Sequence, residues 1–223
     1  MKVKFFAAAL FIQALLMQTA HAELLIELVG GRTDAVPIAV VPFQMTGSAT
    51  GDSIDKIVAA DLHRSGQFRP LPVEDMLSRP TRASEVNYRD FRVLGTDYLV
   101  VGNVEQMVDG TYKVSYELHD VPRGVKLLSE TYQPSPAQMR DVAHAISDRI
   151  YEQLTGVPGA FSTRVVYVTH SRNATWPYQL QYADADGARV QTILKSREPI
   201  MSPSWSPDGK KIAYVSFEGD GLP

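Results

Sequence analysis

Side chains that commonly bind metals or act as nucleophiles are few in this sequence. The chain of 223 residues has no cysteine, which excludes disulfides, thiolate metal sites and cysteine nucleophiles. No two of its histidines stand three or four residues apart, as a metal-binding pair on one helical face would. The sequence therefore predicts neither a metal centre nor a cofactor site. The five histidines are His21, His63, His119, His144 and His170.

Two short patterns imitate reactive or ion-binding motifs. His144 and Asp148 are four residues apart in a helical segment, and we interpret them as a surface pair rather than a base with its orienting carboxylate. Residues 184–187 (Asp-Ala-Asp-Gly) imitate part of a calcium loop. Because Tyr182 and Ile193 occupy the first and last ligand positions of that loop, we predict a hairpin turn instead. Serine-hydrolase, P-loop and zinc-peptidase motifs do not occur in the sequence.

Aromatic residues and net charge give no sign of nucleic-acid binding. Trp176, Tyr178 and Tyr182 could form a stacking platform, but alternating aromatics on a strand more often belong to a core. The formal net charge is -3 at pH 7, without the basic field that nucleic acid requires. We therefore expect no nucleic-acid partner.

Residues 1–22 have the pattern of an export signal. Basic residues at positions 2 and 4 precede an apolar run from Phe5 to Met17, and residues 20–22 (Ala-His-Ala) form a small-x-small cleavage site. A membrane anchor needs about 20 apolar residues, which is more than this run provides. We predict cleavage before Glu23 and a mature protein that lies outside the cytoplasm and has no membrane span.

Residues 23–160 have the pattern of an α/β domain. The nearly continuous apolar run from Pro37 to Phe43 predicts a strand buried on both faces. A polar loop follows, and apolar residues at helical spacing over 54–62 predict a helix that ends near Gly66. Residues 68–71 suit a short second strand, which completes a β-α-β unit.

A meander and a long helix complete this domain after an irregular polar segment with short helical turns at 73–93. Asp109-Gly110 is a strong hairpin signal, because the glycine adopts positive φ without steric cost. Ser135 and Gln138 form a predicted capping box before a helix that ends at Gly156. The pattern therefore predicts a two-layer α/β sandwich with a mixed sheet. The three strand-like runs of the meander are 97–107, 112–121 and 126–132.

Residues 161–223 show strand patterns and no helical periodicity. A turn is predicted just before the last strand-like run. The ring of Pro207 fixes its own φ there, and Gly209 can adopt the left-handed backbone conformation that the turn requires. Four short strands in about 60 residues match the size of one β-propeller blade. The runs are 164–169, 178–183, 189–194 and 211–217, and the repeat turn consists of Trp205, Ser206, Pro207, Asp208 and Gly209.

Residues 203–215 (PSWSPDGKKIAYV) resemble the repeat that builds the propeller of the TolB family. Three other segments resemble that family in the same order and spacing: PIAVVPF at 37–43, IVAADL at 57–62 and LTG at 154–156. The resemblance covers essentially the whole chain and the first half of a TolB. It implies an N-terminal two-layer α/β sandwich with a mixed sheet, followed by the start (one blade) of a six-bladed β-propeller, in the periplasm.

The resemblance also implies two partners and one binding segment. In the TolB family the mature N-terminus binds the C-terminal domain of TolA, and the propeller binds Pal, the peptidoglycan-associated lipoprotein. The segment of this chain that matches the mature N-terminus is mostly apolar. It could add as a strand to the sheet of a partner, or it could complete the sheet of its own domain. A partner would shift the balance between the two states. The segment that matches consists of Glu23, Leu24, Leu25, Ile26, Glu27, Leu28 and Val29.

Two functions of different classes remain open on the sequence alone. The first is a non-enzymatic adaptor of the Tol-Pal system, which maintains the outer membrane and its invagination during cell division. The alternative is a fragment of an exported propeller-bearing peptidase, because such peptidases use a similar repeat. Its catalytic domain would have to lie outside this sequence, with a G-x-S-x-G serine and a later acid and histidine.

Overall fold

A computed structural model describes residues 35–48, 53–172 and 174–219. The predicted export signal and the segment from Glu23 to Val29 lie outside these residues. Within the described part of the chain, no helix combines the length and the apolar character needed to cross a lipid bilayer.

Six strands form one mixed sheet in the first part of the described chain. Their order is β3-β1-β4-β5-β6, and β2 pairs with β4. β1 runs parallel to both β3 and β4, whereas β4, β5 and β6 form an antiparallel meander, which confirms the predicted mixed sheet. The strands are β1 (Val36–Val40), β2 (Gln44–Thr46), β3 (Phe68–Pro70), β4 (Tyr98–Gln106), β5 (Tyr112–Asp120) and β6 (Val125–Tyr132).

The break between β1 and β2 corrects the predicted single strand from Pro37 to Phe43. Pro42 has no N–H to donate to a strand ladder, and the pairing with β4 stops before it and resumes at Gln44. At the break, the side chain of Phe43 occupies the space where Gly102 of β4 has no Cβ. A short strand, β2, therefore precedes the expected polar loop and overlaps it only at Thr46.

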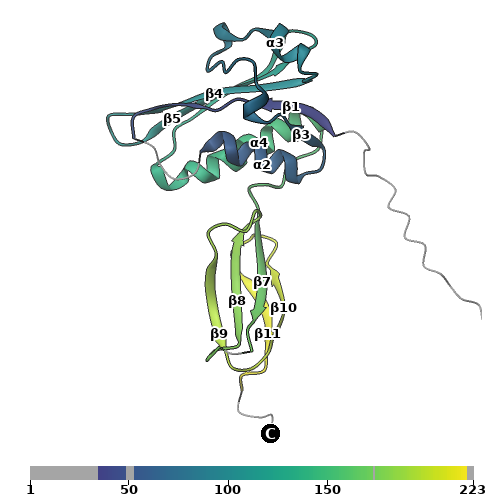
Figure 1. The fold of residues 1–223 in the computed structure, drawn as a ribbon. Coiled ribbons are helices and arrows are strands. Elements are labelled where there is room, and N and C mark those ends of the chain that lie inside the picture. Colours follow the sequence, from purple (N-terminus) through teal and green to yellow (C-terminus); the bar gives the residue numbers. More distant parts are fainter. Residues whose placement is uncertain (1–34, 49–52, 173, 220–223) are drawn as a thin grey trace, which may run out of the picture. The chain divides into compact units, whose positions relative to one another are not determined.

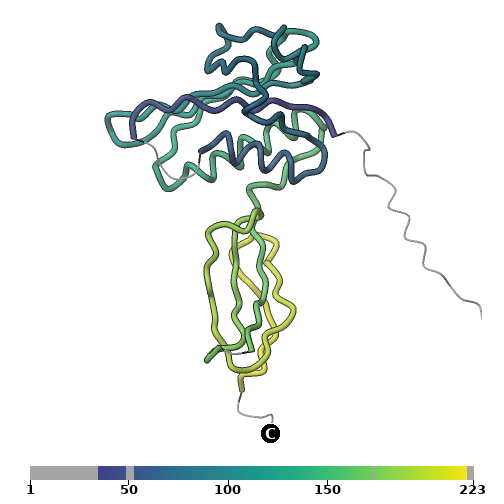
Figure 2. Tube along the Cα trace, viewed as in Figure 1, coloured from purple at the N-terminus to yellow at the C-terminus, as the bar shows by residue number. Residues whose placement is uncertain are grey.

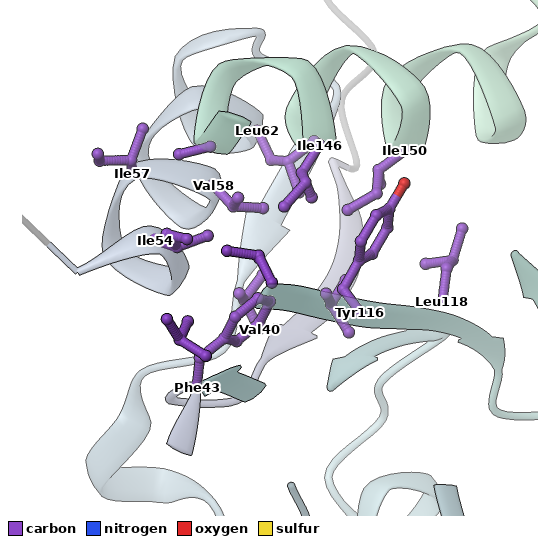
Figure 3. Packing of buried hydrophobic residues seen from close by; sticks show 14 of the residues in the cluster. Val40, Phe43, Ile54, Ile57, Val58, Leu62, Tyr116, Leu118, Ile146 and Ile150 are labelled. Carbon is purple, nitrogen blue, oxygen red and sulfur yellow. The ribbon is translucent and has the colours of Figure 1, made fainter. Parts of the chain in front are cut away.

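Two helices cover one face of this sheet, α2 (Ile54–Arg64) and α4 (Met139–Thr155). Figure 3 shows the apolar side chains of both helices meeting those of β1 and β5. The predicted capping box is confirmed, because the side chains of Ser135 and Gln138 bond to each other's backbone before α4, at the short helix η3 (Pro136–Gln138). Gly156 ends α4 at a φ of 75°, also as predicted.

The opposite face of the sheet is covered by residues 73–93, the polar segment for which short helical turns are predicted. Figure 1 shows α3 (Tyr88–Val93) on the side of β4 and β5 that faces away from α2 and α4. The short helices η1 (Val73–Asp75) and η2 (Ala83–Glu85) precede it. Most residues of this segment are polar, but Met76, just after η1, and Phe91 of α3 are buried in a second core. The buried members of that core are Ala39, Val41, Met76, Phe91, Leu99, Val101 and Val121.

The described residues after α4 form two antiparallel sheets, traced in Figure 2. This agrees with a propeller segment but corrects the assignment of four strands to one blade, because a fifth strand, β10, pairs only with β11. The pattern of β10 was hidden by Ser202, which has a φ of 50°, and by the irregular pairing between Met201 and Ser204. The sheets are β7 (Arg164–His170), β8 (Tyr178–Asp184) and β9 (Gln191–Ser196), and β10 (Ile200–Trp205) with β11 (Ile212–Ser216).

The contact between Phe43 and Gly102 can be tested by Gly102→Ala. A Cβ at this position would lie 2.5 Å from two ring carbons of Phe43, so the substitution should lower the free energy of unfolding by about 1–3 kcal/mol in urea unfolding. Gly219→Ala, whose Cβ would meet nothing within 4 Å, is the matched control. In a double-mutant cycle with Phe43→Leu the two effects should not add. Strict additivity would contradict this packing.

Candidate functional site

A buried histidine lies between the two helices that cover the sheet. His144 of α4 and Asp61 of α2 are both fully buried, and the His144 Nδ1 atom lies 2.7 Å from Asp61 Oδ2. Asp61 follows Ile57 by one helical turn and therefore falls on the apolar face of α2. A charged residue at that position needs a buried partner, and this is the one signal from which the sequence could have indicated a buried polar contact, although not its partner His144.

The predicted surface pair of His144 and Asp148 is wrong. Asp148 accepts hydrogen bonds from the backbone N–H groups of Phe161, at 2.7 Å, and Ser162, at 3.1 Å. It therefore anchors the segment that leads from α4 into β7. Sequence spacing could not show this, because the helical pattern places both residues on one face without revealing what covers that face.

The hairpin turn predicted at residues 184–187 is confirmed, and it also contributes charges to the buried pair. The Gly187 N–H donates to Asp184 O at 2.8 Å, with a φ of 84° at the glycine. Arg140 of α4 pairs with the carboxylates of Asp184 and Asp186. Arg189, just after the turn, pairs with Asp184 and with Asp141 of α4. α4 and this turn belong to one compact unit of the chain.

These contacts form a network that we call the α4–turn cluster. Burial would raise the pKa of Asp186, but the Ala188 N–H and the charge of Arg140 outweigh burial, and that pKa is lowered. Hydrogen bonds to Asp184 and Asp141 raise the pKa of Arg189. Within the described residues, the cluster consists of the carboxylates of Asp61, Asp141, Asp184 and Asp186, the guanidinium groups of Arg64, Arg140 and Arg189, and the imidazole of His144.

A cavity of about 210 Å³ adjoins the cluster and is lined in part by His144, Asp141, Asp184 and Arg189. The second ring nitrogen of His144, Nε2, is buried without a hydrogen-bond partner and lies 3.8 Å from Asp186 Oδ2. One carboxylate oxygen each from Asp61 and Asp186 and one ring nitrogen of His144 lie within 4.8 Å of one another. In the described part of the chain, these three side chains are therefore the ones placed to share a cation.

The repeat turn at Trp205 to Gly209 uses its polar groups internally. Ser206 Oγ donates to Asp208 Oδ1 at 2.6 Å and accepts from the Lys211 N–H at 2.9 Å. Gly209 has a φ of 66°, which is the left-handed conformation that the sequence predicted. These bonds give the turn a structural role in joining β10 to β11.

The aromatic residues before and within β8 do not behave alike. Tyr182 contacts Trp205 edge to face, with ring centroids 6.1 Å apart, and is half-buried. Trp176 lies outside the strand, is 41% exposed and carries the Arg197 guanidinium over its ring at 5.1 Å. The expectation that all three aromatics belong to a core is therefore wrong for Trp176.

A second buried histidine, His119 of β5, faces α3 on the other side of the sheet. Its Nδ1 atom lies 2.9 Å from the Tyr88 hydroxyl, and its Nε2 atom lies 3.2 Å from Glu117 Oε2. Burial lowers the pKa of His119 by more than the nearby Glu117 carboxylate raises it. The side chain is thus held neutral as part of the contact that fixes α3 on the sheet.

Comparison with known protein families divides the chain into two matching regions. Residues 24–127 match the family model of the TolB amino-terminal domain. Residues 151–221 match the family model of the TolB beta propeller domain. The first region contains the strands from β1 to β5 and the first three residues of β6, and the second contains the strands from β7 to β11.

Several characterised proteins are similar to this chain along most of its length. The Tol-Pal system protein TolB of Alcanivorax borkumensis is 64% identical over 95% of this chain and 49% of its own length. That of Xylella fastidiosa is 48% identical over 91% of this chain and 47% of its own length. The crystal structure of TolB from Acinetobacter baumannii matches with a TM-score of 0.74 and 40% identity, covering 83% of this chain and 45% of that one. The chain thus spans about half the length of the curated relatives it matches.

The lowered pKa of His119 predicts that stability falls as the solution is acidified. Above the ordinary histidine pKa of about 6.5, both the folded and the unfolded chain carry a neutral imidazole. Below that pKa, the His119 imidazole binds a proton in the unfolded chain but stays neutral in the folded chain. The free energy of unfolding therefore falls by up to about 1.4 kcal/mol per pH unit. Urea unfolding between pH 8 and pH 5 should show a shallower pH dependence for His119→Gln than for the wild type. The exposed His170→Gln is the control, and equal slopes in all three proteins would contradict the interpretation.

Loss of one carboxylate should weaken the α4–turn cluster strongly. Asp184→Asn leaves Arg140 and Arg189 without a shared negative partner, and we expect a loss of about 3 kcal/mol in free energy of unfolding. The exposed Asp75→Asn is the matched control, with an expected change within about 0.5 kcal/mol. Equal stability of the two variants would show that the ion pairs contribute little.

Proposed function

The chain belongs to the TolB family, and on that premise we propose that it works as a non-enzymatic adaptor of the Tol-Pal system in the periplasm. The observation that carries the proposal is the 64% identity, over 95% of this chain, to a protein named Tol-Pal system protein TolB. In this role the protein would maintain outer-membrane integrity and the invagination of the outer membrane during cell division. An export signal at residues 1–22, cleaved before Glu23, would deliver it to the periplasm.

The contacts of the two buried histidines are different from those of a hydrolase base. In the described structure, His119 bonds to Tyr88, and His144 bonds to Asp61. Neither contact pairs an imidazole with a serine or threonine hydroxyl, as nucleophilic catalysis by a hydrolase would require. The peptidase alternative also loses its main support, since both matching family models describe TolB domains.

We propose that the first residues of the mature chain, Glu23 to Val29, bind the C-terminal domain of TolA. Five of the seven residues are apolar, and the segment is followed by Gly30-Gly31. An extended apolar segment can add to the edge of a partner's sheet, where backbone hydrogen bonds give affinity and alternate side chains give selectivity. The segment precedes β1 in the chain, whose first residue is Val36.

Pal is the second partner in the proposal and would bind to the propeller. The five strands from β7 to β11 are the propeller elements that the structure describes. Several of their apolar side chains are exposed, as expected of sheets that pack against further propeller or partner surface. Among them are Val165, Ile193, Met201, Tyr214 and Val215.

Deletion of residues 23–29 from the mature chain tests the TolA proposal. Titration calorimetry against the C-terminal domain of TolA should show binding by the intact mature chain that weakens at least tenfold on deletion, a loss of about 1.4 kcal/mol or more. The single substitution Leu25→Asp should weaken binding in the same direction, because it places a charge in the apolar segment.

The matched control is Val108→Asp, an equal change at a fully exposed position in the turn between β4 and β5. It should bind TolA like the unaltered chain. Unchanged affinity after the deletion, in a protein with an unchanged unfolding transition, would overturn the assignment of the segment.

A further inference from the structure

The α4–turn cluster contains a nitrogen that has no partner although it is almost completely shielded from water. The side chain of His144 is 3% exposed, and its Nε2 atom makes no hydrogen bond. Leaving a buried polar atom unpaired usually costs about 1–3 kcal/mol, so native proteins rarely retain one without a reason. Nε2 of His144 is therefore a buried polar atom that a ligand could satisfy.

The contact of the other ring nitrogen places one proton of the imidazole. Asp61 Oδ2 lies 2.7 Å from Nδ1, and it accepts the proton of that nitrogen. A neutral ring with its proton on Nδ1 presents a lone pair at Nε2. The same carboxylate–histidine arrangement orients histidines that ligate metals, where the carboxylate fixes the tautomer and raises the basicity of the ligating nitrogen.

An oxygen ligand stands opposite that lone pair. Asp186 Oδ2 lies 3.8 Å from Nε2. Two ligands that each lie about 2.0–2.2 Å from a tetrahedral zinc ion are about 3.4 Å apart, so a small movement of the turn would bring both atoms into range. The adjoining cavity of about 210 Å³ has room for water molecules to complete the coordination.

We propose that His144 and Asp186 bind a divalent transition-metal ion, with Asp61 orienting the imidazole. A site of imidazole and carboxylate ligands suits zinc and its neighbours in the first transition series. The charge of the cluster fits a cation, because its four carboxylates face three guanidinium groups. The bound ion would join α4 to the turn between β8 and β9.

Arg140 limits the affinity of the site and gives the proposal a directional test. Its guanidinium already pairs with Asp186, and it also holds Asp184 through Nε at 3.2 Å. An ion that enters must compete with Arg140 for the Asp186 carboxylate. Removal of this competitor by Arg140→Gln should therefore strengthen metal binding, whereas removal of a ligand should weaken it.

Zinc titration of the whole mature chain tests the site, with calorimetry and the NMR signals of the imidazole nitrogens as readouts. We expect one zinc ion per chain and a shift of the His144 Nε2 resonance. His144→Gln and Asp186→Asn should each weaken binding at least tenfold, and Asp61→Asn by about tenfold to a hundredfold. The exposed His63→Gln and His170→Gln should bind like the wild type.

Circular dichroism and the unfolding transition establish which variants are folded. Asp186 lies in a turn and is less buried than His144, so Asp186→Asn decides the outcome if His144→Gln does not fold. Equal zinc affinity in the wild type and Asp186→Asn, or no binding by the wild type at millimolar zinc, would overturn the proposal. So would weakened binding in Arg140→Gln.

Discussion

Strand β1 is buried on both faces, and the architecture of the α/β domain follows from that burial. Ile38 and Val40 face the core under α2 and α4, while Ala39 and Val41 face the core under α3. Alternate side chains of a strand point to opposite faces, so an apolar run of this kind needs cover on both sides. The helices provide one cover. The irregular segment from η1 to α3 provides the other, and it is as necessary to the fold as the helices.

The same requirement explains why charged residues lie in the interior. Once α2 and α4 pack together on β1, any polar residue in their interface loses water and must find its partner inside. Asp61 and His144 satisfy each other across that interface at 2.7 Å. Arg64 of α2 pairs with the Asp61 carboxylate at 2.8 Å, and the Asp186 carboxylate of the β8–β9 turn lies 3.8 Å from His144 Nε2. The packing of two helices on one strand therefore extends to a contact with the strands that follow.

Local features of the fold could be predicted from the sequence, and contacts between distant residues could not. The Asp109-Gly110 turn and the Ser135–Gln138 capping box depend on residues within a few positions of one another, and both are present. Asp61 and His144 are 83 residues apart in the chain, so no spacing rule could pair them. Strand β10 was hidden for a different reason, since the positive φ of Ser202 breaks the alternation that marks a strand. The sequence contains one signal of the cluster, which is the charged residue Asp61 on the apolar face of α2.

The α/β part and the strands after α4 differ in where their exposed apolar side chains lie. Exposed large apolar side chains of the α/β part lie mostly in turns and at helix ends, as Leu77, Val93 and Val108 do. In the strands after α4, they lie within the sheets themselves, as Val165 and Val215 do. An isolated apolar residue in a turn needs no cover, whereas a row along a strand indicates a surface that packs against another sheet. The apolar cores of the α/β domain are thus built from residues that precede β7, whereas the sheets after α4 leave apolar rows exposed.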